Sequence, residues 1–259
     1  VYYHLIGAPS NGGWPLSMFL TPEREPFAGG TYFPPTDQGG QMSFPRVLQR
    51  VNQLWSADKK QVQQSATIIA KEVARLQKEE AASETIAIES KLVKAGVRAI
   101  NAGYDAEFGG IDFAVDSPNS PKFPTSSKLV LLQYDIQSPA QDPTSAESAK
   151  VLYHTLDAMA NGGIYDHLGG GFHRYSTDRY WHVPHFEKML YDNGQLASLY
   201  ANAFAQTGNV QYKNVTEGII DFVLRELTDP QGGFYSALDA ETDGIEGERY
   251  AWNQEEIKS

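Results

Sequence analysis

The sequence predicts a mainly α-helical protein that begins with a short β-hairpin. Two observations lead to this prediction. After residue 43, apolar residues recur at the spacing of amphipathic helices. From about residue 88, pairs of predicted helices alternate with long loops that contain Gly-Gly pairs, which is a weak internal repeat of helical hairpins. Because alternate connections of an up-and-down helical array lie at the same end, we expect the long loops to share one face.

The N-terminal elements follow from local patterns. Residues 15–20 and 27–33 are strand-like and flank a turn rich in Pro and Glu, which predicts a hairpin. Pro15 follows Trp14 and is a candidate cis-proline, since about 5% of X-Pro bonds are cis. Ser43 is expected to cap a helix that continues to residue 54, and a second helix is expected over residues 62–76.

Further helices are expected at residues 90–103, 126–137, 145–161, 185–206 and 211–228. Thr144 and Glu147 match a capping box for the third of these, and Asn253 with Glu256 indicates another helix start. The sequence begins at Val1 and stops soon after that start. We therefore interpret it as a piece of a longer protein; the alternative is a complete protein with frayed ends.

Composition excludes several function classes. The chain has 21 basic and 32 acidic residues, a net charge of −11, whereas a nucleic-acid binder needs a basic surface. No apolar run approaches the roughly 20 residues of a membrane span. The absence of cysteine excludes disulfides, zinc–thiolate sites and thiol nucleophiles within this chain. It also fits a reducing, cytoplasmic location. No phosphate loop or dinucleotide motif is present, so no cofactor is expected.

The residues suited to chemistry concentrate between Gly162 and Asn193, which hold four of the six histidines. If residues 185–206 form a helix, His185 and Asp192 lie two turns apart on one face, where a base and an orienting carboxylate can cooperate. The catalytic candidates are His185, Asp192, His182 and Glu187. His182 and His185 have a ligand-like spacing, but without a third ligand no metal site is expected.

A second set of residues is suited to binding a substrate. The candidates are Asp166, His167, His173, Arg174, Tyr175, Trp181, Lys188, Asp239 and Glu241. Aromatic rings stack on sugars, and Arg174 or Lys188 can hold an anionic or carbonyl oxygen. Structural alternatives are histidines that satisfy buried carbonyls and an acidic loop that is merely solvated. We expect solvation alone for Glu246 and Glu248, and simple exposure for Lys122.

Several long motifs carry a family resemblance. They lie at residues 12–22, 29–35, 121–124, 162–167, 182–193, 234–241 and 250–252. Together they resemble the spermatogenesis-associated, thioredoxin-domain-containing family over essentially the whole sequence. The resemblance implies a thioredoxin-like domain with a Cys-x-x-Cys-type site, followed by an (α/α)6 barrel. Such a barrel is similar to N-acylglucosamine 2-epimerase and to six-hairpin glycosidases.

The resemblance also implies a domain organisation. Residues 1–43 correspond to the C-terminal hairpin part of the thioredoxin-like domain, and residues 44–87 to the helical segment that completes and links it. Residues 88–259 correspond to the first half of the barrel, a partial (α/α)6 toroid. The Trp14-Pro15 pair corresponds to the cis-proline loop. Because the cysteine segment is missing, a redox role cannot reside in these residues alone.

Two functional hypotheses follow. The first is an enzyme with acid–base chemistry of the sugar epimerase, isomerase or glycosidase type, whose partner is a sugar-like small molecule. The second is a non-catalytic or redox-linked module that binds a protein client, motivated by aromatic residues near the hairpin such as Phe27, Tyr32 and Phe33. The density of histidines and carboxylates favours the enzyme. Neither hypothesis involves nucleic acid or a membrane.

Overall fold

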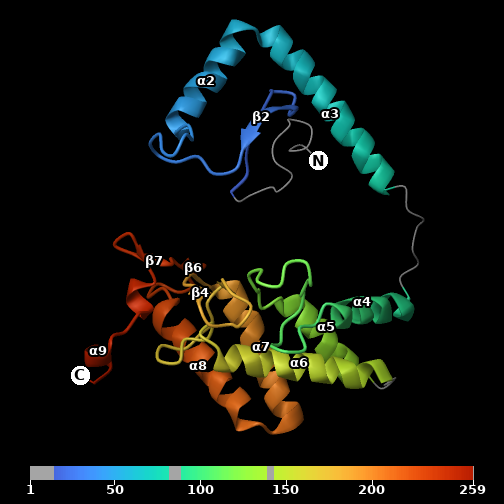
Figure 1. Ribbon diagram of the computed structural model, residues 1–259, viewed down its shortest axis with the longest axis vertical. Helices are drawn as coiled ribbons and strands as arrows, with labels where there is room; N and C mark the ends of the chain where they lie inside the picture. Colours follow the sequence, from blue (N-terminus) through green and yellow to red (C-terminus); the bar gives the residue numbers. More distant parts are fainter. Residues whose placement is uncertain (1–14, 82–88, 139–142, 259) are drawn as a thin grey trace. The chain divides into compact units, whose positions relative to one another are not determined.

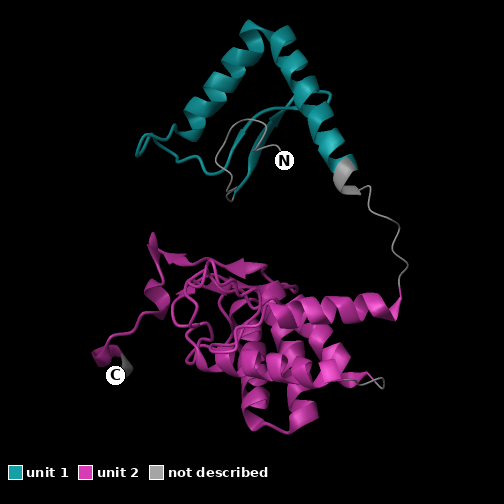
Figure 2. Ribbon diagram, turned by 45° about the vertical axis from the view of Figure 1, so that its right-hand side comes forward, with its two compact units in different colours: residues 1–87 teal, residues 88–259 magenta. Residues whose placement is uncertain are grey.

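The computed structural model describes residues 15–81, 89–138 and 143–258 of the chain (Figure 1). The chain divides into two compact units, residues 1–87 and residues 88–259, which Figure 2 shows in different colours. The peptide bond between Trp14 and Pro15 involves a residue outside the described ranges, so the cis-proline prediction stays a prediction.

The first unit pairs a β-hairpin with two helices. Strands β1 (Ser17–Leu20) and β2 (Pro26–Gly30) are antiparallel, which confirms the predicted hairpin. Helices α2 (Phe44–Ala57) and α3 (Lys59–Ala81) follow, and α3 contacts β2. Ser43 is the N-cap of α2, as expected. Its side chain makes no capping hydrogen bond; instead its backbone amide donates to Asp37 Oδ1 at 2.8 Å.

The second unit is built from helical hairpins. Its helices are α4 (Ser90–Ala102), α5 (Ser126–Gln137), α6 (Pro143–Asn161), α7 (Leu190–Thr207), α8 (Val210–Glu226) and the short α9 (Gln254–Lys258). A 3₁₀ turn spans Glu248–Tyr250. The mainly helical fold class is therefore confirmed.

These helices form two layers. Consecutive helices pack as pairs, α5 with α6 and α7 with α8, while alternate helices also meet, α4 with α6 and α5 with α7. Leu129 and Leu132 of α5, Leu156 of α6 and Leu196 of α7 are fully buried between them. Each hairpin thus covers the apolar face of the next. A toroid of helical hairpins repeats this local arrangement.

Short strands join the long loops of the second unit. They are β3 (Tyr175–Ser176), β4 (Pro184–His185), β5 (Lys188–Met189), β6 (Ala237–Leu238), β7 (Glu241–Thr242) and β8 (Ile245–Glu246). Lys122 bridges to Ser176, and Lys188 pairs with Leu238, so each long loop lies beside the next. This confirms the expectation that the loops share one face (Figure 1).

Two predicted details are wrong and one is confirmed. Helix α7 begins at Leu190 rather than at residue 185, because the preceding residues pair with β3 and β6. His185 and Asp192 therefore do not share a helix face. Thr144 lies inside α6, which already begins at Pro143, so it is not the N-cap. The Asn253–Glu256 capping box is present: each residue's backbone amide donates to the other's side chain, at 2.8 and 3.0 Å.

Among the described residues, no helix is long and apolar enough to cross a bilayer.

Candidate active site

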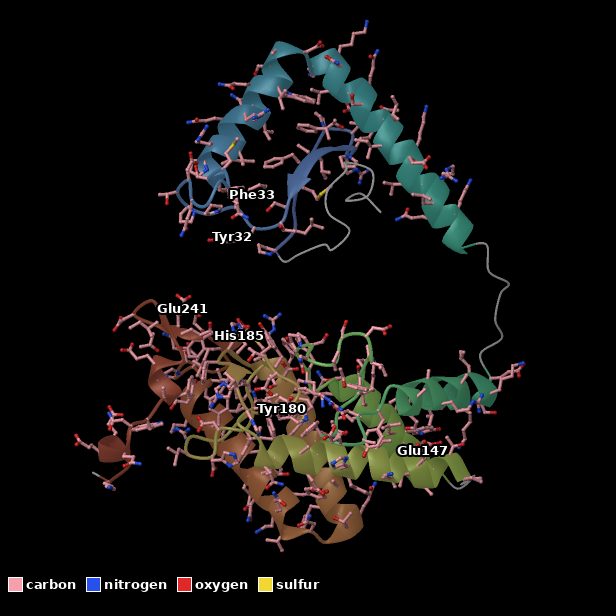
Figure 3. All side chains as sticks on the ribbon, in the orientation of Figure 1. Tyr32, Phe33, Glu147, Tyr180, His185 and Glu241 are labelled. Atoms are coloured by element: carbon pink, nitrogen blue, oxygen red, sulfur yellow. The ribbon has the colours of Figure 1, made fainter. Side chains whose placement is uncertain are left out.

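The candidate site is centred on His185, in the extended segment between Pro184 and Leu190. The antiparallel pairing of β3 with β4 sets the imidazole on the ring of Tyr175, with centroids 5.0 Å apart. Nδ1 lies 2.7 Å from Glu246 Oε1, and Nε2 lies 3.7 Å from Glu187 Oε2. The imidazole therefore stands between two carboxylates. Figure 3 shows His185 among the loops of the second unit.

Glu187 also binds Arg174. The guanidinium Nη1 donates to Glu187 Oε2 at 2.8 Å, and the backbone amide of Arg174 donates to the backbone oxygen of Glu187 at 2.8 Å. This main-chain hydrogen bond fixes the two segments against each other and so holds the side chains of Arg174 and Glu187 within hydrogen-bonding distance. Both side chains remain partly exposed. Glu187 is thus shared between a permanent cation and an imidazole.

Asp192 adds a buried carboxyl in the first turn of α7. Burial raises the pKa of Asp192 to about 6; the positive charge of Arg174 opposes this rise and the negative charge of Glu187 adds to it. Its Oδ2 atom is buried and accepts no hydrogen bond from the described residues. A carboxyl group with such a pKa exchanges its proton near neutral pH, as a general acid or base must.

Three other histidines lie outside this site. The ring of His182 is exposed beside Tyr180, with centroids 5.8 Å apart. His167 is also exposed, and its Nε2 lies 3.0 Å from the backbone oxygen of Gly162. His173 is 2% exposed, and burial lowers its pKa to about 4. Within the described ranges, no group of three or more His, Asp or Glu residues is arranged to hold a metal ion.

The aromatic and acidic candidates are also dispersed. Trp181 is 1% exposed and its Nε1 donates to the backbone oxygen of Phe108 at 3.0 Å, so a ligand cannot reach this ring. Tyr175 stacks on Phe123 as well as on His185. Asp239 and Glu241 are exposed, and Asp239 Oδ1 accepts the backbone amide of Glu241 at 3.1 Å. The pair shapes its own loop.

Lys188 and Asp166 bind each other rather than facing the site. Lys188 is 1% exposed, and its Nζ donates to Asp166 Oδ2 at 2.7 Å and to the backbone oxygen of Gly170 at 2.8 Å. Asp166 Oδ1 accepts the amides of Leu168 and Gly169. Burial works against both charges: it lowers the pKa of Lys188, and only the hydrogen bonds and charge of Lys188 and the loop amides keep the pKa of Asp166 low.

The same arrangement occurs in the preceding loop. Lys122 Nζ donates to Asp105 Oδ2 at 2.7 Å and to the backbone oxygen of Gly109. Gly109 and Gly170 both have a positive φ, 68° and 74°, a conformation that glycine adopts without strain. We call Asp105–Lys122 and Asp166–Lys188 the loop ion pairs. The expectation that Lys122 is exposed is wrong, because it is the buried partner of Asp105.

Two parts of this architecture were not predicted from the sequence. Glu246 was expected to be merely solvated, yet from β8 its side chain contacts His185 of β4, and no local pattern signals this contact. The loop ion pairs had a signal: Asp105 and Asp166 each follow a tyrosine and precede a run of glycines, in which Gly109 and Gly170 stand four residues after the aspartate.

The fold and the site define a two-part protein whose helical-hairpin unit carries a cluster of titratable side chains. We call this set the acid–base cluster: Arg174, His185, Glu187, Asp192 and Glu246. Residues 2–74 match the family model Thioredox_DsbH, described as a protein of unknown function, DUF255. The chain is 40% identical over its whole length to human spermatogenesis-associated protein 20, and 36% identical over 98% of its length to an uncharacterised protein of Caenorhabditis elegans. The predicted resemblance to the spermatogenesis-associated family is thereby confirmed.

The chain spans 33% of the human relative and 35% of the nematode one, so it corresponds to about a third of each. Among solved structures, a sugar epimerase from a ruminal bacterium aligns with 63% of this chain and 43% of its own, at 14% identity and a TM-score of 0.48.

Proposed function

We propose that the second unit is an enzyme that transfers protons on a sugar-like small molecule. One observation carries this proposal: the imidazole of His185 stands between Glu246 and Glu187, and Glu187 is held by Arg174. Ion pairs that only stabilise a fold do not need a partly exposed imidazole at their centre. The resemblance to epimerase-like and glycosidase-like barrels supports a sugar as the substrate.

Each residue has a distinct role in the proposed chemistry. Glu246 accepts the Nδ1 proton of His185 and so orients the ring, which leaves Nε2 to exchange a proton with the substrate. Asp192 supplies the second exchangeable proton, since an epimerase, isomerase or glycosidase needs both a donor and an acceptor. Arg174 is half-exposed and keeps guanidinium hydrogens for a substrate oxygen.

The test uses the whole chain with a panel of aldoses, ketoses, N-acyl amino sugars and disaccharides in deuterated water. NMR detects deuterium that replaces a C–H proton, and a reducing-end assay detects hydrolysis. We expect one readout to be positive and both His185→Gln and Asp192→Asn to slow it about 100-fold or more. His182→Gln is the matched control and should keep the rate. A negative panel, or an Asp192→Asn rate equal to the unmodified chain, contradicts the proposal.

A second candidate function is the binding of a protein client by the first unit. The match to the Thioredox_DsbH model supports it, and so does a hollow of about 470 Å³ between the β-hairpin and α2. Leu20 and Leu48 at this hollow are about half exposed. Leu48→Asp should abolish client crosslinking and leave the deuterium readout unchanged, whereas Gln53→Glu on the same helix should change neither.

A further inference from the structure

The second unit also contains a cavity of about 320 Å³ that the proposed proton transfer does not use. The described residues that line it include Lys188, Phe222, Arg225, Arg249, Tyr250 and Trp252. It lies across the extended segment from the acid–base cluster: Lys188 contacts the rings of Phe222 and Tyr250, whereas His185 contacts Glu246. Successive side chains of an extended chain point to opposite faces, which separates the two sites.

The charges around this cavity do not cancel. Lys188, Arg225 and Arg249 are cations, and among the described lining residues Asp166 and Glu226 are the anions. One positive charge is therefore in excess. A ligand with a single negative charge restores neutrality, whereas a dianion such as a phosphate monoester leaves a net negative charge in the cavity.

The two arginines form a prepared anion site. Arg225 Nε donates to Glu226 Oε1 at 3.0 Å, and Arg249 Nη2 donates to Glu226 Oε2 at 2.7 Å. Glu226 thus holds both guanidinium groups near each other, and Arg225 Nη2 also donates to the backbone oxygen of Gly169 at 2.5 Å. These bonds leave three of the five hydrogens of Arg225 and four of those of Arg249 for a ligand. Both side chains are about half exposed. The fork of a guanidinium matches the two oxygens of a carboxylate, which favours this anion over a spherical one.

The rest of the wall suits a flat ring. Trp252 is about half exposed at the cavity, and Leu238 lies in the same wall. A tryptophan face binds aromatic rings and the apolar faces of sugars. A cavity of this volume is at the lower end of small-molecule sites, so it suits one ring rather than a polymer.

We propose that this cavity binds a six-membered-ring carboxylate, with its carboxylate on Arg225 and Arg249 and its ring against Trp252. The ring is either a sugar uronate or an aromatic acid, and the experiment distinguishes these two sources. The site does not depend on the proposed catalysis, because none of the acid–base residues lines the cavity.

The test is calorimetric titration of the whole chain with glucuronate, with benzoate and with glucose as the uncharged match. We expect at least one carboxylate to bind and glucose to bind about tenfold more weakly or not at all. Arg225→Gln and Arg249→Gln should each weaken carboxylate binding about tenfold, the loss of a charged hydrogen bond. Arg98→Gln, an exposed arginine on α4, is the matched control.

Several outcomes overturn the proposal. One is that neither glucuronate nor benzoate binds at about 10 mM, a concentration well above a millimolar Kd. Another is binding that survives Arg249→Gln, and a third is binding lost in Arg174→Gln, which places the anion at the acid–base cluster. Sulfate, which is a dianion at neutral pH, contradicts the single charge if it binds as tightly as the carboxylates. If Arg249→Gln does not fold, Trp252→Ala replaces an exposed ring and should weaken binding equally. His185→Gln should slow proton transfer about 100-fold or more and leave this binding intact, so the two proposals fail separately.

Discussion

The buried carboxyl group of Asp192 lies near the cation Arg174 and the anion Glu187. Its pKa, raised to about 6 by burial, should therefore respond to both neighbours. Arg174→Gln removes the charge that lowers this pKa, so the pKa should rise further. Glu187→Gln removes the charge that raises it, so the pKa should fall. Carboxyl carbon NMR across a pH titration measures both shifts, and Glu217→Gln on the exposed face of α8 is the control.

Titration of Asp192 at its ordinary value near 3.9, or shifts of the opposite sign in the two variants, contradicts this electrostatic account of the cluster.

His173 should make the fold sensitive to acid. Burial, aided by the charge of Lys188, lowers its folded-state pKa from 6.5 to about 4, so the unfolded chain binds the proton first as pH falls. The stabilisation is present above pH 6.5 and is lost as pH falls towards 4. The full loss is on the order of 3 kcal/mol. Urea unfolding at several pH values should show this loss in the unmodified chain and not in His173→Gln.

Asp192 acts in the opposite sense over an overlapping range. Its folded-state pKa is raised, so its contribution is present below pH 3.8 and is lost as pH rises through about 6. The effect of His173 is therefore read from the difference between the unmodified chain and His173→Gln. An equal pH dependence in the two proteins contradicts the assignment.

At the scale of elements, the loop ion pairs fix how the long loops fold. Removing one partner leaves a buried charge without compensation, which costs about 3–5 kcal/mol. Lys188→Met should lower the free energy of unfolding by that amount in urea titrations. Lys122→Met should cost less, because Arg179 also donates to both carboxylate oxygens of Asp105, at 2.7 and 2.8 Å. Lys128→Met removes a cation that pairs with Asp112 at the surface, and should cost no more than about 1 kcal/mol.

A double variant tests the cause of this loss. Asp166→Asn combined with Lys188→Met removes both charges, and it should be more stable than Lys188→Met alone because no buried carboxylate is left unpaired. A double variant that is less stable than the single one means that Lys188 acts through packing rather than through its charge.

The sequence predicted elements whose causes are local. Apolar periodicity located α4 to α8 within a few residues at most ends, and the Asn253 capping box was correct. The start of α7 was wrong because Pro184 is tolerated in a first helical turn, so nothing nearby excluded a helix at residue 185. The segment is extended because Lys188 and Met189 pair with β6, some fifty residues later. Periodicity within one segment cannot report such a partner.

The candidate site shows the same limit. His185, Glu187 and Asp192 were named because acids and bases cluster in one stretch of sequence. Glu246 arrives from another loop, and the burial that alters Asp192 depends on the packing of α7. Residue types were predictable; their partners were set by tertiary structure.

At the scale of the whole molecule, the two units differ in how much core they contain. Of the described buried apolar residues, Pro34 and Ala66 belong to the first unit and the others to the second. Residues 88–259 alone should therefore unfold in the same main calorimetric transition as the whole chain. Loss of cooperativity in this shortened chain, or a midpoint lowered by more than about 8 °C, roughly 2 kcal/mol or more for a domain of this size, means that the second unit depends on the first.

The strand contacts between successive loops determine where the chain can be cut and rejoined in an engineered variant. Ser176 and Leu238 each stand five residues after the last glycine of the preceding glycine run, Gly171 and Gly233. Each pairs with the lysine-bearing segment of the loop before it. A loop is therefore completed by its successor. A circular permutant with its new termini at Gly208 leaves both contacts between loops, Lys122–Ser176 and Lys188–Leu238, away from the cut. One with its new termini near Thr177 cuts the chain beside Ser176. Chimeras that exchange helical hairpins between homologues should therefore be joined at the short turns between helices.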